Sequence, residues 1–327
     1  MKNLFFRTIE EAYGGKRDLF VLTADLGFKL FDPLQKKLPG RFFDVGVAEA
    51  NMVGISAGLS LSGMQVYCYS IIPFLAMRAS EQIRVDIAYH DLPVKLVGAG
   101  RGFTYGLEGY THYGIEDLAA MRALPNITIV TPGDFEETKA LALQSYNYPH
   151  PLYIRLGQRI EERQAIGRPS RFTIGKGIVI EDGRGLAIIS SGDMLHRAKN
   201  SCRLLRKRGL KPTLVSMHTL KPLDARLIKE LGRTHSSIFT VEEHSLVGGL
   251  GSAAAEVLCE IGYAGIFHRI GLPAIDLAHE KGGAEHLSRH YGLSPERVVS
   301  TILRRLKRGD GNAQIHRLNG RASTRRG

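Results

Sequence analysis

Cysteine is scarce in this sequence, and long hydrophobic runs are absent from it. Cys68, Cys202 and Cys259 are far apart and odd in number, which argues against a disulfide framework or a zinc site. The apolar run near the amino end has only three residues before Glu10 and Glu11, unlike a signal peptide. No later run approaches the roughly 20 apolar residues that a membrane span needs. We therefore expect a cytoplasmic protein with reduced thiols and no membrane association.

Acidic residues are rare at the carboxyl end of the chain. Residues 303–327 hold eight Lys and Arg but only Asp310, so this segment carries +7 of the net charge of +12. The remainder carries about +5, which is too little to indicate a nucleic-acid-binding protein. The basic residues are not interleaved with aromatic ones. Residues 306–327 are therefore predicted to be a disordered tail rather than an arm that binds nucleic acid or a membrane.

Strand and helix patterns alternate along most of the 327 residues. In the first part, strand patterns occur at 19–25, 41–46, 64–70, 94–100 and 127–133. A stretch rich in charge and glycine follows, and further strand patterns occur at 185–192, 212–219 and 236–243. Such alternation predicts parallel sheets with helices on both faces. The sequence thus predicts two doubly wound α/β domains in series, residues 1–160 and 181–305, joined by a linker at 161–180.

One acid, Glu49, stands between a strand pattern and a helix pattern in "GVAEANMVGISAGLSLSG", residues 46–63. The small residues after it allow the helix to approach another backbone closely, so we expect this carboxylate to be buried. A buried charge is costly unless it has a partner or a task, although an acid that only favours the helix start is the alternative. Parallel sheets bind ligands at the carboxyl ends of their strands, and Glu49 and His112 both follow predicted strands.

Three blocks in order resemble the pyrimidine-binding domain of the transketolase family of thiamine diphosphate enzymes. They are "FDVGVAEANMVGISAGLSLSG", "EQIRVDIAYHDLPVKLVGAG" and "GLEGYTHYGIEDLAAMRALPNITIVTPGD". A fourth block, "LKPLDARLIKELGRTHSSIFTVEEHSLVGGLGSAAAEVL", resembles the family's carboxyl-terminal domain. The resemblance covers residues 1 to about 305.

The family's diphosphate-binding domain, with Gly-Asp-Gly followed by Asn, has no counterpart here. The "GDGN" at 309–312 has no strand before it, and we interpret it as chance. The resemblance therefore implies a split enzyme. A partner subunit would carry that domain and its Mg²⁺, this chain would hold no metal, and two copies of each subunit would form a heterotetramer.

The resemblance also implies roles for single residues. Glu49 matches the acid that hydrogen-bonds a ring nitrogen of the cofactor's aminopyrimidine and promotes loss of the thiazolium proton. His112 matches the histidine that orients the donor substrate and transfers protons, and Glu108 matches an acid that contacts the donor sugar. Asp25 matches the acid of the family's "ADL" turn, which we expect to contact the cofactor.

Two further assignments stay open at this point. Ile72 matches the family's stacking phenylalanine when counted without gaps, but Phe74 is favoured because an aromatic face suits a pyrimidine; a core phenylalanine is the rival interpretation. The family's phosphate-binding histidine and arginine have no match, so the expected substrates are sugars, and whether they carry a phosphate stays open. Replacement cations nearby are Lys29, Arg101, Arg155 and Arg159, unless these arginines only solvate loops.

The resemblance implies transfer of a two-carbon ketol unit from a ketose to an aldose, by a subunit that is active only with its partner. One alternative keeps the cofactor: a subunit of a 2-oxo acid decarboxylating or deoxyxylulose-phosphate-synthase-like enzyme. The other is a non-catalytic scaffold paralogue. The presence of both Glu49 and His112 argues against a scaffold, which would need neither.

Overall fold

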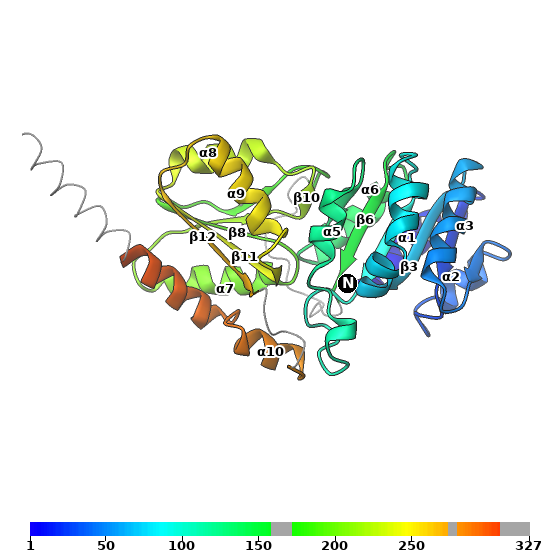
Figure 1. Ribbon diagram of the computed structural model, residues 1–327, viewed down its shortest axis with the longest axis horizontal. Coiled ribbons are helices and arrows are strands. Elements are labelled where there is room, and N and C mark those ends of the chain that lie inside the picture. Colours follow the sequence, from blue (N-terminus) through cyan, green and yellow to red (C-terminus); the bar gives the residue numbers. More distant parts are fainter. Residues whose placement is uncertain (158–171, 274–279, 308–327) are drawn as a thin grey trace, which may run out of the picture.

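The computed structural model describes residues 1–157, 172–273 and 280–307 and contains two α/β units side by side (Figure 1). Each unit has one central, mostly parallel sheet with helices on both faces. The predicted fold class is confirmed. The second sheet begins with β7 (Ile178–Glu181), which starts within the last residues of the predicted linker. The other predictions for residues 161–171 and 308–327 lie outside the described residues.

The first sheet has seven strands in the order β10–β5–β6–β4–β3–β1–β2. Strands β3 and β4 are buried along nearly their whole length, as expected of parallel strands that helices cover on both faces. Strand β6 was not among the predicted strands. The six parallel strands are β1 (Leu19–Thr23), β2 (Phe42–Asp44), β3 (Gln65–Ile71), β4 (Lys95–Ala99), β5 (Thr128–Val130) and β6 (Leu152–Leu156).

Apolar side chains from two groups of helices cover the first sheet. Helix α6 begins after Asp134, whose carboxylate accepts a hydrogen bond from the backbone N of Glu137 at 2.8 Å, a favoured N-terminal cap. One face carries α1 (Lys2–Tyr13), α2 (Asp32–Lys37) and α6 (Phe135–Ser145). The other carries α3 (Glu49–Leu61), η1 (Phe74–Arg78), α4 (Ser80–Gln82), η2 (Ile83–Ala88) and α5 (Asp117–Ala123).

The second sheet has five strands in the order β12–β11–β8–β9–β7, of which only β7 is antiparallel to its neighbour. Its other strands are β8 (Leu186–Ser190), β9 (Thr213–Ser216), β11 (Ser237–Ser245) and β12 (Ile266–Leu272). Its helices are α7 (Met194–Arg206), α8 (Ala225–Thr234), α9 (Leu250–Glu260), α10 (Ala284–His290) and residues 295–307. Across the described ranges, no helix is both long enough and apolar enough to cross a membrane.

A short strand from the second half of the chain completes the first sheet. Strand β10 (Thr219–Lys221) pairs antiparallel with β5, although it follows β9 of the second sheet directly. The strand pattern predicted at 212–219 is thus divided between two sheets. The backbone N of Thr131 donates to the carbonyl of His218 at 2.7 Å where the chain crosses.

The loop after β4, residues 100–116, lies against the second unit. The Nε atom of Arg101 donates to Oδ2 of Asp193, just after β8, at 2.9 Å. The ring of Phe103 stacks on that of Tyr291, with 5.4 Å between the ring centroids. These contacts fix the loop from its first residues onward and join the two units.

The Arg101–Asp193 pair should contribute strongly to stability because the arginine is buried. We expect Asp193→Ala to lower the free energy of unfolding by about 3 to 5 kcal/mol, since it leaves a buried guanidinium without its carboxylate. Glu256→Ala is the matched control, because Glu256 pairs with Arg122 across the same two units at 2.7 Å but is 62% exposed. That change should cost only about 0 to 1 kcal/mol. Equal losses in urea unfolding would contradict this account.

Glu137 of α6 lies between the two units. Its Oε1 atom accepts a hydrogen bond from Ser216 of β9, and its Oε2 atom accepts one from the backbone N of Gly133, both at 2.6 Å. Burial raises the pKa of this carboxyl to about 7, although both hydrogen bonds oppose the shift. The folded protein therefore holds this proton more tightly than the unfolded chain does.

This raised pKa predicts a loss of stability as the pH rises. The stabilising effect of the proton is complete below the unfolded pKa of about 4.5 and disappears as the pH passes through about 7. Glu137→Gln stays neutral, so between pH 5 and 8 it should lose less stability than the wild type, by on the order of 3 kcal/mol. Urea unfolding at both pH values measures this, with Glu136→Gln in the same helical turn as control. An unchanged pH dependence in Glu137→Gln would disprove the assignment.

Candidate active site

Glu49 is the first residue of α3 and follows β2 at the carboxyl edge of the first sheet. Its side chain is 1% exposed. Ser70, near the end of β3, donates a hydrogen bond to Oε1 of Glu49 at 2.9 Å. Arg78, at the end of η1, donates through Nη1 to Oε2 at 3.0 Å. Each carboxylate oxygen thus has one donor, and the helix start adds a favourable dipole.

An aromatic ring and an imidazole extend this group of residues. The guanidinium carbon of Arg78 lies 4.1 Å from the ring centroid of Phe74. The ring of Phe74 in turn meets that of His112 edge to face, with centroids 5.0 Å apart at an interplanar angle of 70°. Contacts therefore run from Glu49 through Arg78 and Phe74 to His112, so the structure brings the two main predicted residues to one site.

Ile72 lies away from this row of contacts. Its side chain is fully buried and packs against two glycines. A Cβ atom at Gly98 would lie 2.7 Å from the methylene carbon Cγ1 of Ile72, and one at Gly114 would lie 2.9 Å from the methyl carbon Cγ2. Both positions therefore need glycine. Phe74 is half-buried and faces His112 instead. The contacts favour Phe74 as the ring beside Glu49, and its role toward a pyrimidine stays a prediction.

The predicted donor-site residues lie on loops after strands. His112 ends the short helix η3 (Tyr110–His112), and its Nδ1 atom contacts Oγ1 of Thr111 at 2.9 Å. Glu108 is exposed and lines a cavity of about 700 Å³ between its own loop, α7 and α10. These two residues share a loop, but only His112 is seen in contact with Phe74.

Asp25 and Lys29 belong to the loop after β1, and both are exposed. Both have a positive φ, 53° for Asp25 and 61° for Lys29, a conformation uncommon for residues other than glycine. The backbone N of Asp25 donates to Oδ1 of Asp44 at 2.8 Å, which ties this loop to the end of β2. The loop therefore has a defined shape beside the strand that leads to Glu49.

The two arginines proposed as substrate contacts are buried in ion pairs. Arg101 is held by Asp193, through the contact that joins the two units. Arg155 of β6 donates through Nε to Oδ2 of Asp117 at 2.6 Å. Burial alone would raise the pKa of Asp117, but Arg155, His244 and the hydrogen bonds outweigh it and lower that pKa. These contacts do not favour a substrate role for either arginine, and Arg159 lies outside the described residues.

Sequence reasoning missed Ser70 and Arg78, the two donors to Glu49. A weak signal existed for Arg78, which follows Phe74 by four residues and so shares its side of a helix. Nothing in the apolar run "VYCYS" marked Ser70 as different from a core serine. In the described part of the chain, no three His, Cys, Asp or Glu side chains gather as a metal site would require.

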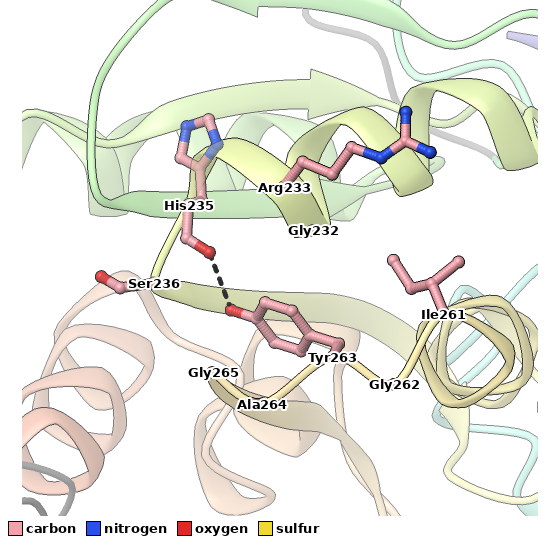
Figure 2. A pocket seen from close by; sticks show the side chains of 9 residues that line it. All are labelled: Gly232, Arg233, His235, Ser236, Ile261, Gly262, Tyr263, Ala264 and Gly265. Atoms are coloured by element: carbon pink, nitrogen blue, oxygen red, sulfur yellow. Dashed lines mark hydrogen bonds between the residues drawn. The ribbon is translucent and has the colours of Figure 1, made fainter.

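A separate surface cavity of about 370 Å³ lies in the second unit, between the end of α8 and the loop after α9 (Figure 2). The hydroxyl of Tyr263 donates to the carbonyl of His235 at 3.1 Å across it. None of the predicted site residues lines this cavity. The residues around Glu49 therefore remain the candidate active site.

Comparisons with known proteins cover both units. The family model for the transketolase pyrimidine-binding domain matches residues 1–160, and the model for the transketolase C-terminal domain matches residues 175–298. A putative transketolase C-terminal section from Methanocaldococcus jannaschii is 36% identical over 313 residues, 94% of this chain and 96% of that protein. One subunit of the apulose-4-phosphate transketolase of Phocaeicola vulgatus is 33% identical, over 93% and 96% of the two chains.

Similarity to a solved structure extends over both units. A split-gene transketolase, solved as an inactive β4 tetramer, aligns with a TM-score of 0.82 at 33% identity and covers 94% of this chain and 97% of its own. A 1-deoxy-D-xylulose-5-phosphate synthase from Caldanaerobacter subterraneus is 33% identical over 85% of this chain, but only 44% of the synthase is matched. The chain belongs to the transketolase family, with that family's pyrimidine-binding and C-terminal domains in series.

Proposed function

We propose that this chain is the pyrimidine-binding subunit of a split transketolase, which moves a two-carbon ketol unit from a ketose donor to an aldose acceptor. The observation that carries the proposal is Glu49, a buried carboxylate at a helix start with an aromatic ring and a histidine nearby. Two relatives support the proposal, a putative transketolase C-terminal section and a transketolase subunit. This chain matches each of them over 96% of its length.

The side chains around Glu49 fit an aminopyrimidine. The buried carboxylate can pair with a ring nitrogen, and the half-exposed face of Phe74 can stack on the ring. Thiamine diphosphate, when bound, would supply the nucleophilic carbon that attacks the ketose carbonyl. Glu49 would hold a proton at Oε2, because the donor to that oxygen, Arg78, is exposed, whereas the donor to Oε1, Ser70, is buried. Asp25 would support the cofactor site from the neighbouring loop.

His112 would act on the sugar rather than on the cofactor. Because Nδ1 contacts Thr111, Nε2 is the atom available to orient a donor hydroxyl and to transfer its proton. Glu108 and Lys29 would contact the polar end of the donor. Lys29 is exposed, whereas Arg101 and Arg155 are buried in ion pairs, so we favour Lys29 as the cation that meets a sugar phosphate.

Exposed apolar side chains at the carboxyl edge of the first sheet support the proposal that a partner subunit binds there. Each lies within a few residues of a site residue, on the loops and segments after β1, β2, β3 and β4, and such exposure is typical of surfaces that another protein covers. They include Phe28, Val47, Met77, Leu107 and Tyr110. The partner would carry the diphosphate-binding domain and its Mg²⁺, in an assembly of two copies of each chain. The tetramer of the similar split-gene transketolase supports self-association.

Matched length favours this proposal over the alternatives. The transketolase sections and subunits match along nearly their whole length, whereas the deoxyxylulose-phosphate synthase matches over less than half. A scaffold would not need Glu49 and His112 together at one site. The cytoplasmic location stays a prediction.

The purified chain alone should bind thiamine diphosphate weakly and lack transketolase activity, because the diphosphate and metal half of the site belongs to the partner. Isothermal titration calorimetry with Mg²⁺ measures this, and adding a diphosphate-binding partner should restore tight binding. Micromolar or tighter binding by the chain on its own would rule out a split site.

Glu49→Gln should impair activation of the cofactor rather than folding. The change keeps the size of the side chain but removes its exchangeable acid proton, and losses of general acid–base catalysis are typically about 10²- to 10⁴-fold. In the reconstituted complex, NMR would follow exchange of the thiazolium proton with D₂O, beside thermal melting.

Asp32→Asn is the matched control for Glu49→Gln, since Asp32 is an exposed acid in the first turn of α2. It should cost about 0.3 to 1 kcal/mol of stability and leave proton exchange unchanged. If Glu49→Gln behaves in the same way, Glu49 is only a helix-start acid and the proposed role is wrong.

A further inference from the structure

Arg78 occupies the part of the site that an aminopyrimidine would need. Its guanidinium donates to Oε2 of Glu49 at 3.0 Å and lies 4.1 Å from the ring centroid of Phe74. A guanidinium is planar, donates hydrogen bonds in its plane to a carboxylate and stacks on aromatic faces. An aminopyrimidine paired with Glu49 and stacked on Phe74 would use the same carboxylate oxygen and the same ring face.

We infer that Arg78 competes with the pyrimidine ring for its place in the site. In the separate subunit Arg78 occupies this place, and it must leave when the ring binds. The inference rests on the proposed function and adds a residue that controls access to the site. In the separate subunit Arg78 gives the buried carboxylate of Glu49 a partner, which such a charge requires.

The surroundings of Arg78 allow this exchange. Its side chain is 48% exposed, whereas that of Glu49 is 1% exposed, so the arginine can swing into water while the carboxylate stays in place. Arg78 itself loses little by leaving, because water can solvate its exposed guanidinium, and the aminopyrimidine then becomes the partner that the buried carboxylate needs. Ser70 keeps its hydrogen bond to Oε1 of Glu49 throughout, so the carboxylate does not lose its orientation.

The opposite role would be permanent positioning, in which Arg78 stays on Glu49 and helps to bind the ring. The two roles predict opposite effects of Arg78→Ala. A competitor that occupies the site about nine-tenths of the time lowers the apparent affinity about tenfold, so its removal should raise the affinity by that factor. Removal of a positioning residue should weaken binding.

The test uses the pyrimidine half of thiamine, 4-amino-5-hydroxymethyl-2-methylpyrimidine, as a probe of the isolated chain in NMR titrations. Arg78→Ala should bind the probe about tenfold more tightly than the wild type. Arg84→Ala is the matched control, because Arg84 is an exposed arginine on η2, and it should bind as the wild type does. Arg78→Lys keeps the charge but not the planar group and should also bind more tightly, which covers the case in which Arg78→Ala does not fold.

The same four proteins, reconstituted with a diphosphate-binding partner, are then titrated with thiamine diphosphate and Mg²⁺. Tighter binding by both Arg78 variants supports the inference. Binding by the wild-type complex with no gain, or with a loss, in the Arg78 variants overturns the inference but leaves the proposed function intact. Absence of binding by every chain and every complex overturns both.

Discussion

The ion pair between the buried Arg101 and the half-buried Asp193 joins the two units beside the loop that carries His112. Arg101 opens the loop after β4, and Asp193 follows β8 at the carboxyl edge of the second sheet. Open α/β sheets usually bind ligands at that edge. In this protein Arg101 of the first unit contacts Asp193 at that edge of the second sheet. The second sheet therefore supports the loop, and the first sheet carries the residues of the candidate site.

The loop between Arg101 and His112 shows how this support is achieved. Gly102 has a φ of +59°, and a Cβ atom there would lie 1.9 Å from Oε2 of Glu243 on β11, so only glycine permits the close approach. Its backbone exchanges hydrogen bonds of 2.8 and 3.1 Å with Gly114 at the other end of the loop. The loop is thus closed on itself and anchored, which gives His112 a fixed base.

Sequence patterns predicted the architecture well because the strands are apolar runs flanked by helical patterns. Blocks of matching spacing singled out Glu49 and His112, which the structure brings to one site and whose roles stay predictions. Patterns along the chain do not show contacts that long-range pairing decides. Arg155 was proposed as a substrate contact, and nothing along the chain indicated that α5 brings Asp117 to it from 38 positions earlier. Strand β10 has three residues, so no local periodicity could show that it joins the other sheet.

The proposed division of the site between two chains would place a physical demand on Glu49. If one chain formed the whole cofactor site, the carboxylate would already be enclosed before the cofactor bound. In a separate subunit the same carboxylate must be stable before the other half of the site arrives, yet it must remain able to take a new partner. A permanent donor on Oε1, from Ser70, and an exchangeable donor on Oε2, from Arg78, meet both conditions. The first fixes the orientation of the acid, and the second keeps its charge satisfied at the oxygen that would pair with the pyrimidine ring.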